Sequence, residues 1–73
     1  MPKLGVFSGA EVCEILQAHG FQLVRQRGSH LVMQRRVEGS TITVPVPNHR
    51  VLRIGTLLSI IRQSGLPKEV FMK

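Results

Sequence analysis

The chain has 73 residues, with ten lysines and arginines against four acidic residues and a formal net charge of +6. A chain of this length has room for one compact core, so we expect one domain over residues 1–73 and exclude a multidomain protein. The basic balance favours a polyanionic partner, and no stretch approaches the roughly 20 apolar residues of a transmembrane helix. We therefore expect a cytoplasmic protein that makes no membrane contact.

The first predicted element is a helix from Ser8 to His19. Ser8 and Glu11 have the spacing of a capping box, in which each side chain accepts a hydrogen bond from the other residue's backbone N–H. Gly20 follows as the residue that ends the helix. Cys13 falls within the apolar pattern of this helix, so we interpret it as a small buried side chain without a disulfide or redox role.

Two strand-like runs follow, at residues 21–27 and 30–36. Gly28 and Ser29 lie between them and predict the tight turn of a hairpin. The second strand therefore begins at His30.

A third strand is predicted from the alternating β-branched residues of Thr41–Val44, after a turn at residues 37–40. Pro45 and Pro47 cannot donate ladder hydrogen bonds. We expect them to end the sheet, unless they lie on an edge strand.

Apolar residues then return to helical spacing, which predicts a second helix with a single apolar stripe, and Gly65 ends this helix. The order of helix, three antiparallel strands and helix predicts an α+β fold in which both helices cover one face of the sheet and the other face stays open. The residues of the stripe are Ile54, Leu57, Leu58 and Ile61.

The distribution of reactive side chains excludes most enzyme chemistries. The three histidines lie far apart and the single cysteine is alone, so we expect no metal site and no cofactor. The four glutamates form no pair suited to two-metal or glycosidase chemistry, and no glycine-rich phosphate loop is present. Metal-free RNA cleavage remains, because the ribose 2′-hydroxyl is the nucleophile and the protein need only move protons and stabilise charge.

His30 is the best-placed side chain for that proton transfer, since histidine exchanges protons near neutral pH. Arg25 and Arg27 precede it, and Arg35 and Arg36 lie at the far end of its strand, where their guanidinium groups suit phosphate. A structural or merely solvated strand histidine is the plainer interpretation and stays open.

The other two histidines have simpler explanations. His19 is expected to complement its helix C-terminus. His49 is expected to hold the loop that follows the third strand.

Four groups of residues stand out between about Phe7 and Leu66. They are Gly20-Phe21, Gly28-Ser29-His30, Val46-Pro47-Asn48-His49, and Gly55-Thr56-Leu57 with residues 60–66. In this order and spacing they resemble the HicA-type (YcfA-like) mRNA interferase toxins. The resemblance implies a double-stranded-RNA-binding-domain-like fold, cleavage of messenger RNA, and silencing by a HicB-type antitoxin that covers the active site. It also implies that the histidine of the Gly-Ser-His motif is catalytic, and that histidine is His30 here.

Together these observations predict the toxin of a type II toxin–antitoxin pair, a metal-independent endoribonuclease that inhibits translation and growth and is monomeric when free of its antitoxin. Without Trp or Tyr, base stacking contributes little, so we expect backbone contacts and strong salt dependence. Gly28 and Ser29 either contact RNA or only shape the turn. The candidate RNA contacts are Arg25, Arg27, Gly28, Ser29, Arg35 and Arg36.

Two functions of other classes stay open. One is a non-catalytic RNA-binding module with the same fold, which would leave RNA uncut. The other is a protein-interaction domain whose basic face meets only an acidic protein.

Overall fold

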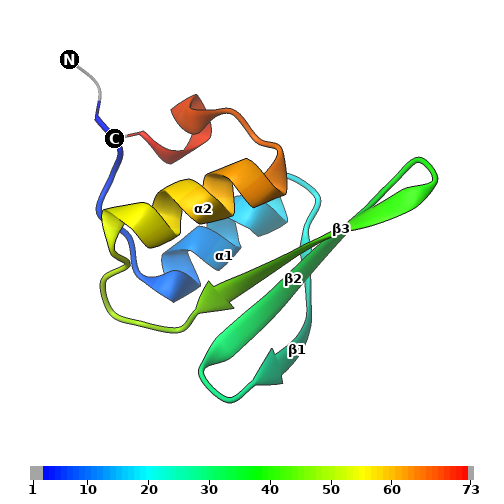
Figure 1. Cartoon of the computed structure of the whole chain (residues 1–73), viewed down its shortest axis with the longest axis horizontal. Coiled ribbons are helices and arrows are strands. Elements are labelled where there is room, and N and C mark those ends of the chain that lie inside the picture. Colours follow the sequence, from blue (N-terminus) through cyan, green and yellow to red (C-terminus); the bar gives the residue numbers. More distant parts are fainter. Residues whose placement is uncertain (1–2, 73) are drawn as a thin grey trace.

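The computed structural model describes residues 3–72. Three strands form one antiparallel sheet in the order β1-β2-β3. Figure 1 shows α1 and α2 on the same side of this sheet, which confirms the predicted α+β, double-stranded-RNA-binding-domain-like order of helix, three strands and helix. The elements are α1 (Gly9–Ala18), β1 (Gln22–Arg27), β2 (His30–Val37), β3 (Ser40–Pro47), α2 (Ile54–Ser64) and the short 3₁₀ helix η1 (Lys68–Phe71).

The capping box predicted for α1 is present. The Ser8 hydroxyl accepts from the Glu11 N–H at 3.1 Å, and the Glu11 carboxylate accepts from the Ser8 N–H at 2.9 Å. Gly20 has a φ of +94° just after the helix, as its predicted ending role requires. Cys13 is buried, and burial raises the pKa of its thiol, which confirms its interpretation as a packing residue.

A β-bulge interrupts the pairing of β1 with β2. Leu23 pairs with Met33, but the next partner of β2, Val32, pairs with Arg25. The extra residue, Val24, shifts the alternation of side chains by one position. As a result Arg25 lies on the open face of the sheet, although Leu23 two residues earlier lies on the helix-covered face.

β3 runs further than the sequence predicted. Pro45 pairs with Val32 and Pro47 pairs with His30, so the first of the two predicted alternatives, that the prolines end the sheet, is wrong. The edge-strand alternative is correct, because β3 is the last strand of the sheet and a proline's missing N–H is tolerated on an outer edge.

The core lies between the sheet and the two helices, and no helix within residues 3–72 has the length and apolarity needed to cross a bilayer. Phe71 of η1 is fully buried and meets Phe7 edge-on, with ring centroids 6.4 Å apart. η1 therefore packs against the core. The residues buried to at least 98% are Val12, Leu16, Phe21, Met33, Val44, Val46, Leu57, Ile60, Ser64 and Phe71.

The predicted apolar stripe on α2 is only partly buried. Leu57 and Ile61 are buried, but Ile54 is 59% exposed and Leu58 is 38% exposed. α2 packs chiefly against the edge strand β3. One strand covers only one flank of a helix, so the neighbouring flank stays in water although its residues are apolar.

Gly9 makes the closest approach between α1 and the sheet. Its N–H donates to the His49 carbonyl at 2.9 Å. A Cβ at this position would collide with the Pro47 carbonyl oxygen and reach the Asn48 Cα at 3.0 Å, and both are backbone atoms that cannot rotate away. By contrast, a Cβ on Gly55, in the first turn of α2, would meet nothing within 4 Å.

The same substitution should therefore have opposite effects at the two glycines. Gly9→Ala should lower the free energy of unfolding by about 1–3 kcal/mol, because the collision forces a backbone shift. Gly55→Ala should raise it by up to about 1 kcal/mol, because alanine is the better helix former. Urea denaturation followed by circular dichroism measures both values, and a Gly9→Ala protein as stable as wild type would contradict the close packing of α1 on β3.

Candidate functional site

His30 is the first residue of β2 and its side chain is exposed. It pairs with Arg27 on one neighbouring strand and with Pro47 on the other. Met33 faces the helices and is fully buried, so by the alternation of the strand His30 faces the open side. The imidazole therefore stands on the open face of the sheet, at the end of its central strand.

The turn before His30 is fixed by the fold. Gly28, the first residue of this two-residue turn, has a φ of +57°. No described residue other than glycine has a positive φ, so the turn depends on a glycine at this position. The Ser29 carbonyl accepts a hydrogen bond from the Asn48 N–H at 2.6 Å. This bond continues the pairing of β2 and β3 past their ends, so the backbone on the N-terminal side of His30 is held to the end of β3.

A hollow of about 390 Å³, the sheet-face hollow, lies on one side of His30. Arg25 and Arg27 of β1 contribute two guanidinium groups, and none of its lining residues is acidic. Its lining residues are Arg25, Arg27, His30, Val32, Gln34, Thr43 and Pro45.

A second hollow of about 300 Å³, the edge hollow, lies between the end of β3 and α2, and His30 lines it as well. On the side of α2, Thr56 and Ser59 contribute hydroxyl groups and Gln63 contributes an amide. The Ser59 hydroxyl accepts from the Gln63 amide at 3.0 Å, and its own O–H can donate. The lining residues are His30, Pro45, Pro47, Gly55, Thr56, Ser59, Ile60 and Gln63.

The polar side of α2 was not singled out in the sequence. Thr56, Ser59 and Gln63 stand at positions i, i+3 and i+7, a spacing that places them on one helix face. A polar stripe of this kind is ordinary on a solvated helix. Only the packing of α2 beside β3 brings it to His30.

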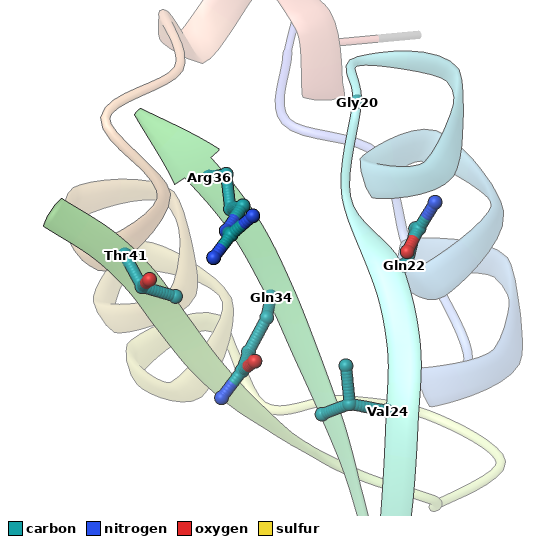
Figure 2. Close-up of a pocket in the computed structure, with 6 residues that line it drawn as sticks. All are labelled: Gly20, Gln22, Val24, Gln34, Arg36 and Thr41. Carbon is teal, nitrogen blue, oxygen red and sulfur yellow. The ribbon is translucent and has the colours of Figure 1, made fainter. Parts of the chain in front are cut away.

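The other predicted arginines lie apart from His30. Arg36 shares the open face but is six residues along β2, about 20 Å away at the usual strand rise. Figure 2 shows it there with Gln34, Thr41 of β3 and Val24 of β1. Arg35, its neighbour in the strand, is half-buried on the other face, with its Nε 3.5 Å from where a Cβ on Gly20 would stand.

The remaining histidines behave as structural residues. The His19 Nδ1–H donates to the Ile15 carbonyl at 3.0 Å, which confirms its predicted role at the C-terminus of α1. The His49 carbonyl accepts the Gly9 N–H at 2.9 Å, so its backbone ties the loop after β3 to the start of α1. Within residues 3–72, no three side chains of histidine, cysteine or acidic residues come close enough together to hold a metal ion.

The surface of residues 3–72 presents no Phe, Tyr or Trp side chain for base stacking. All three phenylalanines are buried, and the chain has no Trp or Tyr. Nucleic acid at this site would be held by its phosphates and sugars, with little stacking of its bases.

Comparison with known families identifies the chain. The family described as "HicA toxin of bacterial toxin-antitoxin" matches residues 9–66, which include both hollows and the turn that precedes His30. No curated protein and no solved structure matches the chain. A match over this much of the sequence shows membership and implies an antitoxin partner, so the chain belongs to the HicA toxin family of bacterial toxin–antitoxin systems.

Proposed function

We propose that this toxin is an endoribonuclease that cleaves messenger RNA in the cytoplasm and thereby stops translation and growth. One observation carries the proposal: His30 stands where the sheet-face hollow meets the edge hollow. A strand of RNA that crosses the end of the sheet from one hollow to the other passes directly over the imidazole. Its phosphates meet guanidinium groups on one side and hydroxyl groups on the other.

In this reaction the protein needs only to transfer protons and to stabilise negative charge. The ribose 2′-oxygen attacks the adjacent phosphorus, the O2′–P bond forms, and the P–O5′ bond breaks. His30 acts as the general base that takes the 2′-hydroxyl proton while water protonates the departing 5′-oxygen, or as the general acid that protonates the 5′-oxygen while water takes the 2′-hydroxyl proton. The products are a 2′,3′-cyclic phosphate and a free 5′-hydroxyl.

Arg25 and Arg27 supply the electrostatic part of the proposal. The non-bridging oxygens on the phosphorus gain negative charge in the transition state, and guanidinium groups stabilise such charge through paired hydrogen bonds. Both arginines line the same hollow as His30. The bulge at Val24 places the side chains of both arginines on the open face of the sheet.

Arg36 extends the positive surface along β2 and is proposed to contact RNA further from the scissile bond. Arg35 contributes only to the net charge, because it faces the helices. Gly28 and Ser29 are proposed to act through the turn geometry that positions His30.

Replacing His30 tests the catalytic step. His30→Ala should lower the rate of RNA cleavage by about 10²–10⁴-fold, the usual contribution of a positioned proton-transfer group. RNA affinity and thermal stability should change little, because the side chain is exposed. The measurement is single-turnover cleavage of a labelled messenger RNA, with the ends identified as a cyclic phosphate and a 5′-hydroxyl.

His49→Ala is the matched control, since it removes another exposed imidazole and leaves the backbone bond to Gly9 intact. It should cleave at close to the wild-type rate. If His30→Ala cleaves as fast as this control, His30 has no part in catalysis. If the wild-type protein binds RNA and leaves it uncut, the non-catalytic RNA-binding module is correct.

Salt dependence tests the two arginines. The double change Arg25→Gln and Arg27→Gln should reduce the steepness of the slope of log binding constant against log salt concentration by about 1.4. Each phosphate contact to a single strand contributes about 0.7 to this slope. Arg35→Gln should leave the slope unchanged because Arg35 lies on the other face. Fluorescence anisotropy with a labelled RNA gives these slopes, and an equal effect of Arg35→Gln would mean that the open face does not define the RNA site.

A further inference from the structure

The edge hollow differs in chemistry from the sheet-face hollow on the other side of His30. The described residues that line it include no Arg and no Lys, whereas Arg25 and Arg27 line the sheet-face hollow. Apart from the imidazole, its polar side chains are two hydroxyls and one amide, all neutral. Its volume of about 300 Å³ is that of a small ligand pocket. The two hollows therefore suit different parts of an RNA strand.

Gln63 brings both kinds of hydrogen-bonding group to the edge hollow. Its Nε2 donates one hydrogen to the Ser59 Oγ at 3.0 Å. A primary amide has two N–H donors and one carbonyl acceptor, so a second N–H and the carbonyl oxygen remain for a ligand. Ser59 is half-buried and lies one helical turn away, so this bond fixes the direction of the amide.

Apolar surface closes the rest of the edge hollow. Pro45 and Pro47 of β3 line it on one side, and Ile60 of α2, which is only 2% exposed, lines it on the other. None of these three side chains carries a hydrogen-bonding group. The flat face of a nucleobase can lose water favourably against such surface while its polar edge reaches the amide of Gln63.

A phosphate fits the amide of Gln63 less well than a base does. The amide carbonyl can only accept a hydrogen bond, and a phosphodiester carries a negative charge and has no proton to donate. The edge of a base can offer a donor beside an acceptor, a pattern that glutamine reads through two parallel hydrogen bonds. The hydroxyls of Thr56 and Ser59 can still donate to phosphate, so base and phosphate contacts do not compete.

One other glutamine makes a similar bond on the open face. The Gln34 Nε2 donates to the Thr43 Oγ1 at 3.3 Å. Gln34 lines the sheet-face hollow together with Arg25 and Arg27, whose guanidinium groups favour phosphate there. Gln63 is therefore the glutamine that a base can reach without displacing a phosphate from a guanidinium group.

We propose that the edge hollow receives one unpaired base of the RNA strand that crosses His30, and that Gln63 selects this base. The inference rests on the proposed function, because His30 lines the same hollow and the selected base belongs to a nucleotide beside the scissile bond. Single-stranded RNA can turn a base out of its stack, whereas a base in a duplex keeps its edge paired. Phosphate contacts hold the strand, and the amide supplies sequence preference.

The test measures base preference, which a loss of stability alone does not change. Short single-stranded RNAs are identical except at one nucleotide, which carries each of the four bases in turn and is moved along the strand. Each RNA is also made with 2′-O-methyl groups throughout, so that it can be bound but has no nucleophile. Single-turnover cleavage and fluorescence anisotropy are measured for wild type and for the variants, and circular dichroism reports folding.

At one position beside the scissile bond, wild type should favour one base over the least favoured by roughly tenfold, as expected for a paired contact between an amide and a base. Gln63→Ala should lose most of this ratio. Ser59→Ala should reduce the ratio, because the amide loses the bond that directs it. Gln34→Ala, the matched control, should keep the ratio. Gln63→Glu should shift the preference towards cytosine, whose exocyclic amine donates to a carboxylate.

Equal binding and equal cleavage of all the RNAs by wild type would overturn the proposal. So would a ratio that survives in Gln63→Ala, or one that disappears in Gln34→Ala instead. The two forms of RNA separate this result from the nuclease activity. Base preference in binding without any cleavage would contradict the nuclease and support the base site, whereas cleavage with an unchanged ratio in Gln63→Ala would do the reverse.

Discussion

The backbone of residues 47–49 joins parts of the fold that are far apart in sequence. It accepts the N–H of Gly9 at the start of α1 and donates to the carbonyl of Ser29 in the first hairpin turn. Gly9 has no Cβ, so α1 can begin directly against the end of β3. Since His30 follows Ser29, these backbone contacts hold it at the end of β3, the strand on which α2 packs.

A second constraint decides which side chains share the face of His30. Adjacent residues of a strand point to opposite sides, so Arg35 and Arg36 could never act on one surface, and this separation is readable from the sequence alone. The position of Arg25 is not readable in this way. The bulge beside it resets the alternation, and it arises from how β1 pairs with β2.

Local signals in the sequence were sufficient for the helix and turn boundaries, as in the capping box of Ser8 and Glu11, because those signals act over three or four residues. Features that depend on which elements become neighbours could not be predicted. Pro45 stays in the sheet only because β3 is an edge strand. Hydrophobic spacing shows that Ile54 is apolar and helical, but not whether anything covers it. The wall of the edge hollow at Ser59 likewise exists only once α2 has packed.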